Sequence, residues 1–219
     1  MEPQVEELTD VAPNIGAAYE ITVFDKDGKV KQVISEDAKC YVQNFLRMLR
    51  FWYTTGGDNG YVSGGGGNAV LAPFRNLTGA IVQSGGYYPA SSIGLNYGSF
   101  LGDALLGDLT KGIVTGTGVV AVTADDYCMG TLIAHGSAVG QMIYDASSFL
   151  PLNIVGSTIT VTISRMVTNS TASAITFTEI GLYLKGMISI MVLRDIVSPS
   201  VSLNPGESAL IAYRLIVNG

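Results

Sequence analysis

The feature that most constrains the fold is a succession of short apolar segments, separated by turn-forming residues, that fills the chain from Lys111 onward. Each segment has strand length and is bounded by Gly, Pro, Asn or Ser. Many short strands with turn signals between them favour a sandwich or barrel over a parallel α/β sheet. The strand candidates are 112–114, 119–122, 141–144, 158–167, 174–184, 187–194 and 207–217.

We therefore predict a mainly β protein, a jelly-roll-like β-sandwich with one amphipathic helix packed against it. A chain of 219 residues is long enough to bury a core of its own. We expect an acidic N-terminal arm over 1–18 and a segment over 19–110 that holds a hairpin, the helix and a Gly/Tyr-rich stretch. The sandwich core spans 111–219, alone or as one domain with 19–53.

The first part of the second segment has clear local patterns. Residues 19–24 and 30–34 alternate in polarity around the turn signal 26–29, which predicts a β-hairpin. A helix over 36–53 is expected next, because Ser35 can cap it and apolar residues then recur at three- and four-residue spacing. The predicted packing face of this helix comprises Val42, Phe45, Leu46, Leu49 and Trp52.

The stretch 54–110 is rich in Gly, Tyr, Ser and Asn. Long structureless loops are uncommon in compact domains, so two interpretations stay open: a binding or assembly loop, or a set of short strands. Aromatic side chains on glycine-rich loops can contact proteins or stack on sugars, and ordinary packing of loops is the alternative. The candidate interface or glycan contacts are Tyr61, Tyr87, Tyr88 and Tyr97.

Three charged residues interrupt apolar strand faces and predict a buried ionic cluster. Strict alternation places Arg165, Glu179 and Arg194 on apolar faces of successive strands. If 158–167 and 174–184 pair as a hairpin, Glu179 is a diagonal neighbour of Arg165. We predict that Glu179 pairs with Arg165 or Arg194, because an unpaired buried charge costs several kcal/mol. A catalytic glutamate is the alternative, although no other reactive side chain accompanies it in the pattern.

Composition and motifs argue against several functional classes. The net charge is −6 and no basic cluster is present, so we expect neither nucleic-acid nor membrane partners. The N-terminus lacks the pattern of a secretion signal, and Cys40 and Cys128 are read as free thiols. No cofactor, metal site or catalytic set is predicted. Chemistry-bearing motifs that are too incomplete to support one are the lone His135, Asp125-Asp126 and Thr115-Gly116-Thr117-Gly118.

Several short motifs resemble a module of virion structural proteins from tailed phages and related prokaryotic viruses. The resemblance covers roughly 36–53 and 111–219. The motifs are Tyr41-Val42-x-Asn44-Phe45-Leu46, Gly112-Ile113-Val114, Gly116-Thr117-Gly118, Asp126-Tyr127, Leu132-Ile133-Ala134-His135-Gly136, Asn169, Thr178-Glu179-Ile180-Gly181-Leu182-Tyr183, Arg194-Asp195 and Pro205-Gly206-Glu207.

The resemblance implies a non-enzymatic structural protein of the virion, made in the host cytoplasm. Its partners would be copies of itself, in a homo-oligomer, and capsid or tail proteins of the same particle, in a decoration, turret, head-fibre or tail role. A low-charge, apolar chain is compatible with such assembly. A carbohydrate-binding receptor-recognition module is the alternative hypothesis, and an enzyme such as a glycan hydrolase or a cupin-like metal protein is the third.

Overall fold

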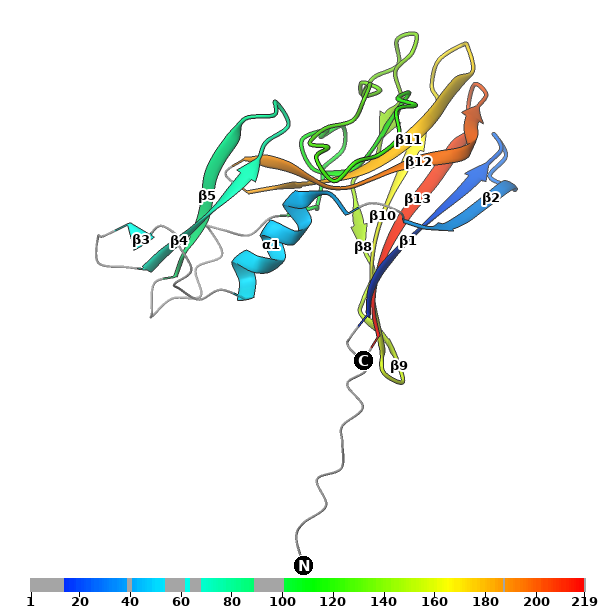
Figure 1. Ribbon diagram of the computed structural model, residues 1–219. Helices are drawn as coiled ribbons and strands as arrows, with labels where there is room; N and C mark the ends of the chain where they lie inside the picture. The colour runs from blue at the N-terminus through cyan, green and yellow to red at the C-terminus, as the bar shows by residue number, and fades with distance from the viewer. Residues whose placement is uncertain are drawn as a thin grey trace, which may run out of the picture.

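The computed structural model describes residues 14–38, 41–53, 62–63, 68–88, 101–186 and 188–218. In these residues the protein is mainly β, as the sequence predicts, with antiparallel strands in three sheets and one helix. Figure 1 shows two of them, here called sheets A and B, crossing in the body of the molecule, with sheet C beside the helix. The body is β-sandwich-like, and jelly-roll connectivity stays a prediction.

Sheet A has its N- and C-terminal strands next to each other at its centre. Its order is β2 (Val30–Asp37), β1 (Asn14–Phe24), β13 (Ser208–Asn218) and β10 (Thr158–Thr168). Three short strands pair with the far edge of β10: β7 (Ile143–Tyr144), β8 (Ser148–Phe149) and β9 (Asn153–Val155). The predicted N-terminal hairpin is therefore β1–β2, and it completes the sandwich. The arm predicted over 1–18 was too long, because 14–18 pair with β13.

Sheet B consists of β12 (Ser189–Leu203), β11 (Ile175–Lys185) and β6 (Gly112–Gly116). The main hydrophobic core lies between sheets A and B. Sheet A contributes Tyr19, Ile21 and Ile211, and sheet B contributes Phe177 and Ile180, all at most 1% exposed. Because β13 lies between β1 and β10, its apolar pattern is that of a central strand.

The helix α1 (Gln43–Tyr53) packs beside sheet C, which consists of β3 (Val62–Ser63), β4 (Asn68–Arg75) and β5 (Ile81–Tyr88). The buried Asn44 side chain joins these elements. Its amide donates to the carbonyls of Arg75, 2.7 Å away, and Met191, 3.2 Å away, and its oxygen accepts from the Arg75 N–H. Short strands are thus present in the Gly/Tyr-rich segment. The described helix is too short to cross a membrane.

The helix begins later than predicted. Residues 36–37 lie in β2, and Ser35 pairs with Glu20 of β1 instead of capping a helix. Hydrogen bonds between β1 and β2 satisfy the backbone N–H and C=O groups of these residues, so strand pairing prevails over the local capping signal. Of the predicted packing face, Val42 and Phe45 are buried, but Leu46 is 61% exposed and was wrongly placed. The side chains of Leu49 and Trp52 lie outside the described residues.

The predicted pairing of 158–167 with 174–184 is wrong. β10 belongs to sheet A and β11 to sheet B, so the chain crosses between sheets at the corner 169–173. Asn169, fully buried, builds this corner: its amide donates to the Ser173 and Leu203 carbonyls, both 2.8 Å away. The predicted strand 119–122 is also absent, because this segment is loop and exposes Val119 and Val120.

Candidate functional site

A β-bulge in sheet B decides where Glu179 points. The pairing of β11 with β12 shifts register between Phe177 and Glu179. Before the bulge Ile175 and Phe177 face the core, and after it Ile180 and Leu182 do, so the alternation changes by one residue. Glu179 consequently lies on the outer face of sheet B. The prediction from strict alternation, which placed it on the face of Ile175 and Phe177, was wrong.

Glu179 and Arg194 form a buried ion pair on this outer face. Arg194 stands opposite Gly181, and Glu179 stands opposite Ile196, so the two charged residues are diagonal neighbours on β11 and β12. Arg194 Nη2 and Nε lie 2.7 and 2.9 Å from Glu179 Oε2. Glu179 is 0% and Arg194 3% exposed. Of the two partners expected for Glu179, the structure contains Arg194.

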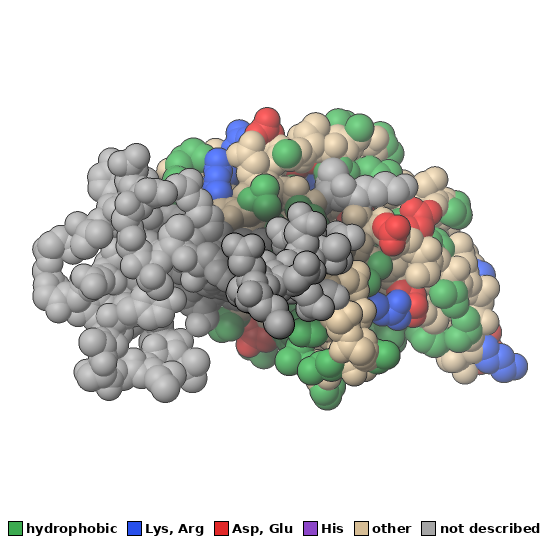
Figure 2. Space-filling view, turned by 60° about the horizontal axis from the view of Figure 1, so that its bottom comes forward, with side chains coloured by type: hydrophobic (Ala, Val, Ile, Leu, Met, Phe, Trp, Pro, Cys, Tyr) green, Lys and Arg blue, Asp and Glu red, His purple; other side chains and the backbone are tan. Residues whose placement is uncertain are grey.

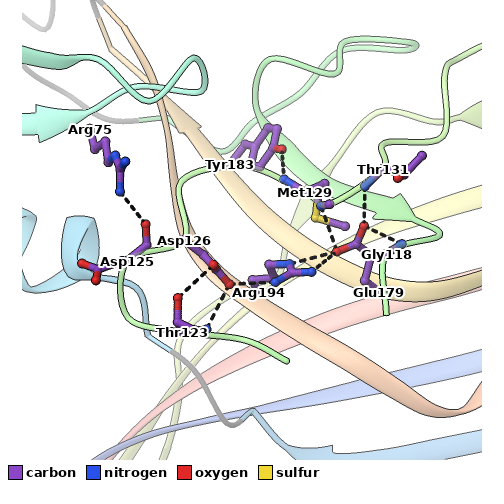
Figure 3. Close-up of polar contacts among 11 residues, drawn as sticks. Arg75, Gly118, Thr123, Asp125, Asp126, Met129, Thr131, Glu179, Tyr183 and Arg194 are labelled. Atoms are coloured by element: carbon purple, nitrogen blue, oxygen red, sulfur yellow. Dashed lines mark hydrogen bonds and ion pairs between the residues drawn. The ribbon is translucent and has the colours of Figure 1, made fainter. Parts of the chain in front are cut away.

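The Glu179 carboxylate also holds a loop that crosses sheet B. Oε1 accepts the N–H groups of Gly118 and Thr131, both at 2.9 Å, and Oε2 accepts that of Gly130 at 3.1 Å. A Cβ on Gly116 or Gly118 would clash with Oε1, so these glycines are required by the close approach of the carboxylate. Figure 3 shows both oxygens directed at the loop backbone. The motif Thr115-Gly116-Thr117-Gly118 therefore packs closely against the carboxylate of Glu179.

Arg194 extends the cluster to a second carboxylate. Its Nη1 donates to Asp126 Oδ2 at 2.7 Å, and Asp126 also accepts from the backbone N–H and hydroxyl of Thr123 at 3.1 and 3.0 Å. Burial by itself raises the pKa of Asp126, but the hydrogen bonds from Thr123 and Arg194 outweigh it and hold that pKa below its ordinary value. Residues 117–131, with Glu179 and Arg194, are called the loop network below.

The loop network also contacts the helix and sheet C. Arg75, at the end of β4, lies over the Tyr127 ring at 4.3 Å, and its Nη1 donates to the Asp125 carbonyl at 2.9 Å. Gln43, the first residue of α1, donates to Asp125 Oδ1 at 2.6 Å. In Figure 3, Arg75 and Asp125 lie on one side of Arg194, and Glu179 lies on the other side. One short loop thereby connects sheet B, sheet C and α1.

A small apolar cluster lies under the loop network. Tyr183 accepts the Met129 N–H on its hydroxyl oxygen at 2.9 Å and packs with Val114 and Met191. Burial raises the pKa of Tyr183, and the nearby charges of Cys128 and Glu179 act in the same direction. Cys128 is a free thiol, as predicted, and burial raises its pKa as well. Cys40 lies outside the described residues.

Arg165 does not belong to this cluster, so that part of the prediction was wrong. It lies on the inner face of sheet A and is 1% exposed. Its guanidinium donates to the carbonyls of Asp145, Ile113 and Leu105 at 2.7, 3.0 and 3.1 Å. It also lies 5.1 Å from the centre of the Tyr144 ring. Burial lowers the pKa of Arg165, opposed by the neighbouring acidic groups.

The remaining predicted residues fall into two groups. Tyr61 and Tyr97 lie outside the described residues, as do the side chains of Tyr87 and Tyr88, although the backbone of both belongs to β5. His135 accepts the Tyr144 N–H on Nδ1 at 3.2 Å and is thus hydrogen-bonded within the fold. Within the described residues, no three His, Cys, Asp or Glu side chains converge to hold a metal ion.

Sequence reasoning missed the role of two Asn-x-Thr motifs, Asn76-Leu77-Thr78 and Asn169-Ser170-Thr171. Asn169 Oδ1 accepts the N–H of Thr171 at 2.9 Å and its hydroxyl at 2.8 Å. Asn76 Oδ1 accepts the same two groups of Thr78 at 3.0 and 2.8 Å. A short polar side chain two residues before a threonine is a turn signal, and that mechanism could have located both corners from the sequence.

The geometry of the cluster is that of a structural clamp. Both oxygens of Glu179 accept hydrogen bonds from the chain itself, and Arg194 is divided between two carboxylates. The described cluster thus directs its strong donors and acceptors at each other. The chain matches no protein-family model, no curated protein and no solved structure among known proteins.

Proposed function

We propose that the protein is a non-enzymatic structural component of the particle of a tailed prokaryotic virus. The observation that carries this proposal is that the resembling motifs meet in the loop network. Glu179 and Arg194 contact Gly118 and Asp126, although these residues are far apart in the sequence. The motifs therefore act together to fix loops on a sandwich, which is the task of a scaffold and not of a reaction centre.

The proposed role is assembly on the capsid, as a decoration or turret protein, or on the tail. The clamp holds the loop over sheet B rigidly, because a carboxylate with three backbone donors and a buried arginine has few alternative geometries. A rigid loop on a sandwich is a suitable contact surface for a neighbouring particle protein. The free thiol of Cys128 agrees with synthesis in the host cytoplasm.

The test of this role is mass spectrometry of virus particles purified by density gradient from a culture that carries the gene. We expect the chain to co-sediment with the major capsid protein at a fixed ratio through successive gradients. Its absence from the particles would contradict the proposal. Particles produced after deletion of the gene are the control, and their loss of a capsid or tail feature in electron micrographs would locate the protein.

A further inference from the structure

The inner face of sheet A continues beyond the part that sheet B covers. Strand register defines its rows of side chains. The last covered row contains Tyr19, Tyr213 and Ile163, which are 1, 2 and 6% exposed, beside Phe149. Two further rows follow toward the chain ends on the same face. They consist of Ala17, Leu215 and Val161, then Ile15, Val217, Ile159 and Ile154.

The first outer row is partly covered, since Ala17 is 6% exposed and Leu215 packs against the core, and exposure rises beyond it although the apolar pattern does not change. On β10 the exposed fraction increases from 6% at Ile163 to 36% at Val161 and 39% at Ile159. Ile15 on β1 and Ile154 on β9 are 42 and 64% exposed. Figure 1 shows β1, β13 and β9 running past sheet B toward the bottom of the view. The core-facing pattern therefore extends where the described residues leave it open.

A short segment marks where the core ends. A Cβ at Gly102 would lie 3.1 Å from Ile163 and Leu184 atoms and 3.3 Å from Phe149. The segment at Gly102 thus packs against the last covered row, between sheets A and B. Figure 2, in which the bottom of Figure 1 comes forward, shows hydrophobic side chains gathered in the lower part of the described surface. The two outer rows, with the neighbouring Phe149, are called the apolar extension.

The apolar extension contains no charged side chain in a chain whose net charge is −6. Arg214, the nearest charged residue on β13, lies on the opposite face and pairs with Glu20 at 2.8 Å. Residues 1–13 contain four carboxylates, for which this charge-free face offers no ionic partner. A charge-free sheet surface is the usual character of an interface core.

We propose that the apolar extension docks against the same surface of a second copy of this chain. This inference rests on the assembling role proposed above and names its contact surface. Two identical twisted sheets pack face to face about 10 Å apart, and a two-fold axis makes the match self-complementary. Because neither face carries a charge, the contact brings no like charges of two acidic copies together.

The size of the apolar extension suits the centre of such a contact. Two rows about 7 Å apart on four strands about 4.8 Å apart cover roughly 250 Å² of sheet. The neighbouring Phe149 is 50% exposed and brings the surface to roughly 350 Å², since a Phe side chain can bury about 200 Å² in all. A standard interface buries about 800 Å² per partner, with a polar rim around such a core.

The test is the mass of the full-length protein in solution, measured by light scattering coupled to gel filtration from about 1 to 100 μM. We expect a dimer or a multiple of it. Ile159→Glu, which places one unpaired carboxylate per copy in the contact, should raise the dimer dissociation constant at least about 100-fold. Ile154→Glu, on the edge strand β9, should act in the same direction. Thr160→Glu is the matched control, because it adds the same charge on the opposite face.

A monomeric parent protein at all concentrations would overturn the inference, as would an unchanged mass of Ile159→Glu. Equal dissociation by Thr160→Glu would show that added charge and not this face controls assembly, which also overturns it. Unchanged circular dichroism spectra and melting curves show that each variant is folded. These outcomes are separate from the particle test: a monomer found in virions contradicts this contact and leaves the structural role intact.

Discussion

Among the residues whose side chains the structure describes, two arginines are buried, and their guanidinium groups are satisfied in different ways. Arg194, on the outer face of sheet B, contacts two carboxylates, whereas Arg165, on the inner face of sheet A, contacts backbone carbonyls. Burial alone lowers the pKa of each guanidinium. The pKa of Arg194 is nevertheless raised, because Asp126 and Glu179 outweigh burial, while that of Arg165 stays lowered.

Buried arginine therefore has two different structural roles in this protein. Arg165 closes irregular backbone, since the carbonyls of Asp145, Ile113 and Leu105 come from three separate segments. Arg194 instead pairs with the carboxylates of Glu179 and Asp126, whose burial without a cation would be costly. Its loss therefore leaves a charged partner behind, whereas the loss of Arg165 leaves only neutral acceptors. Stability measurements can separate these two cases.

The largest effect is expected when the shared carboxylate is neutralised. Glu179→Gln places an amide where four hydrogen-bond donors converge, so donor faces donor and Arg194 keeps only Asp126 as a charged partner. We expect the free energy of unfolding to fall by about 3–5 kcal/mol. Urea denaturation at one fixed protein concentration measures it.

The matched control for that substitution is Glu20→Gln. Glu20 pairs with Arg214 at 2.8 Å, but these side chains are 32 and 37% exposed. Exposed ion pairs contribute little, so we expect a loss of at most about 1 kcal/mol. Equal losses for Glu179→Gln and Glu20→Gln would mean that the buried clamp does not stabilise the fold.

The second prediction compares the arginines directly. Arg165→Met keeps the aliphatic stem and removes the donors to four backbone carbonyls, which should cost about 2 kcal/mol. Arg194→Met leaves the fully buried Glu179 without its cation and should cost about 3–5 kcal/mol. Denaturation of both variants under identical conditions shows which substitution lowers the free energy of unfolding more. A larger loss for Arg165→Met would reverse the comparison.

The sequence predicted those parts that depend on local pattern. The β1–β2 hairpin and the apolar faces follow from alternation within one strand. The two arginines were wrongly placed together because a bulge before Glu179 changes which face it occupies, and bulges leave no period-2 signal. The strand partners could not be predicted either. Asn169 builds the corner that sends β10 and β11 into different sheets, and one of its hydrogen bonds goes to the Leu203 carbonyl, which is distant in the sequence.

Acid should weaken the Arg194 site. The pKa of Asp126 is lower in the folded protein than its ordinary value, so its contribution to stability is present above about pH 4 and is lost as pH falls through the folded pKa. Asp126→Asn should cost about 1–2 kcal/mol at pH 7 and reduce the slope of stability against pH in the acid range. Denaturation between pH 3 and 7 tests it. An unchanged slope would mean that Asp126 does not contribute to the loss of stability in acid.

The smallest effects concern the tyrosine that accompanies each arginine. Tyr183→Phe leaves the Met129 N–H, in a residue 5% exposed, without its acceptor, and we expect a loss of about 1–2 kcal/mol. Tyr144→Phe keeps the ring beside Arg165 but removes a donor from the Ile133 carbonyl at 2.9 Å and the partner of the buried Thr115 hydroxyl at 2.6 Å. Because two buried groups lose a partner, we expect a loss of about 1–2 kcal/mol here as well. An unchanged free energy of unfolding for either variant would mean that its hydroxyl does not support the neighbouring arginine site.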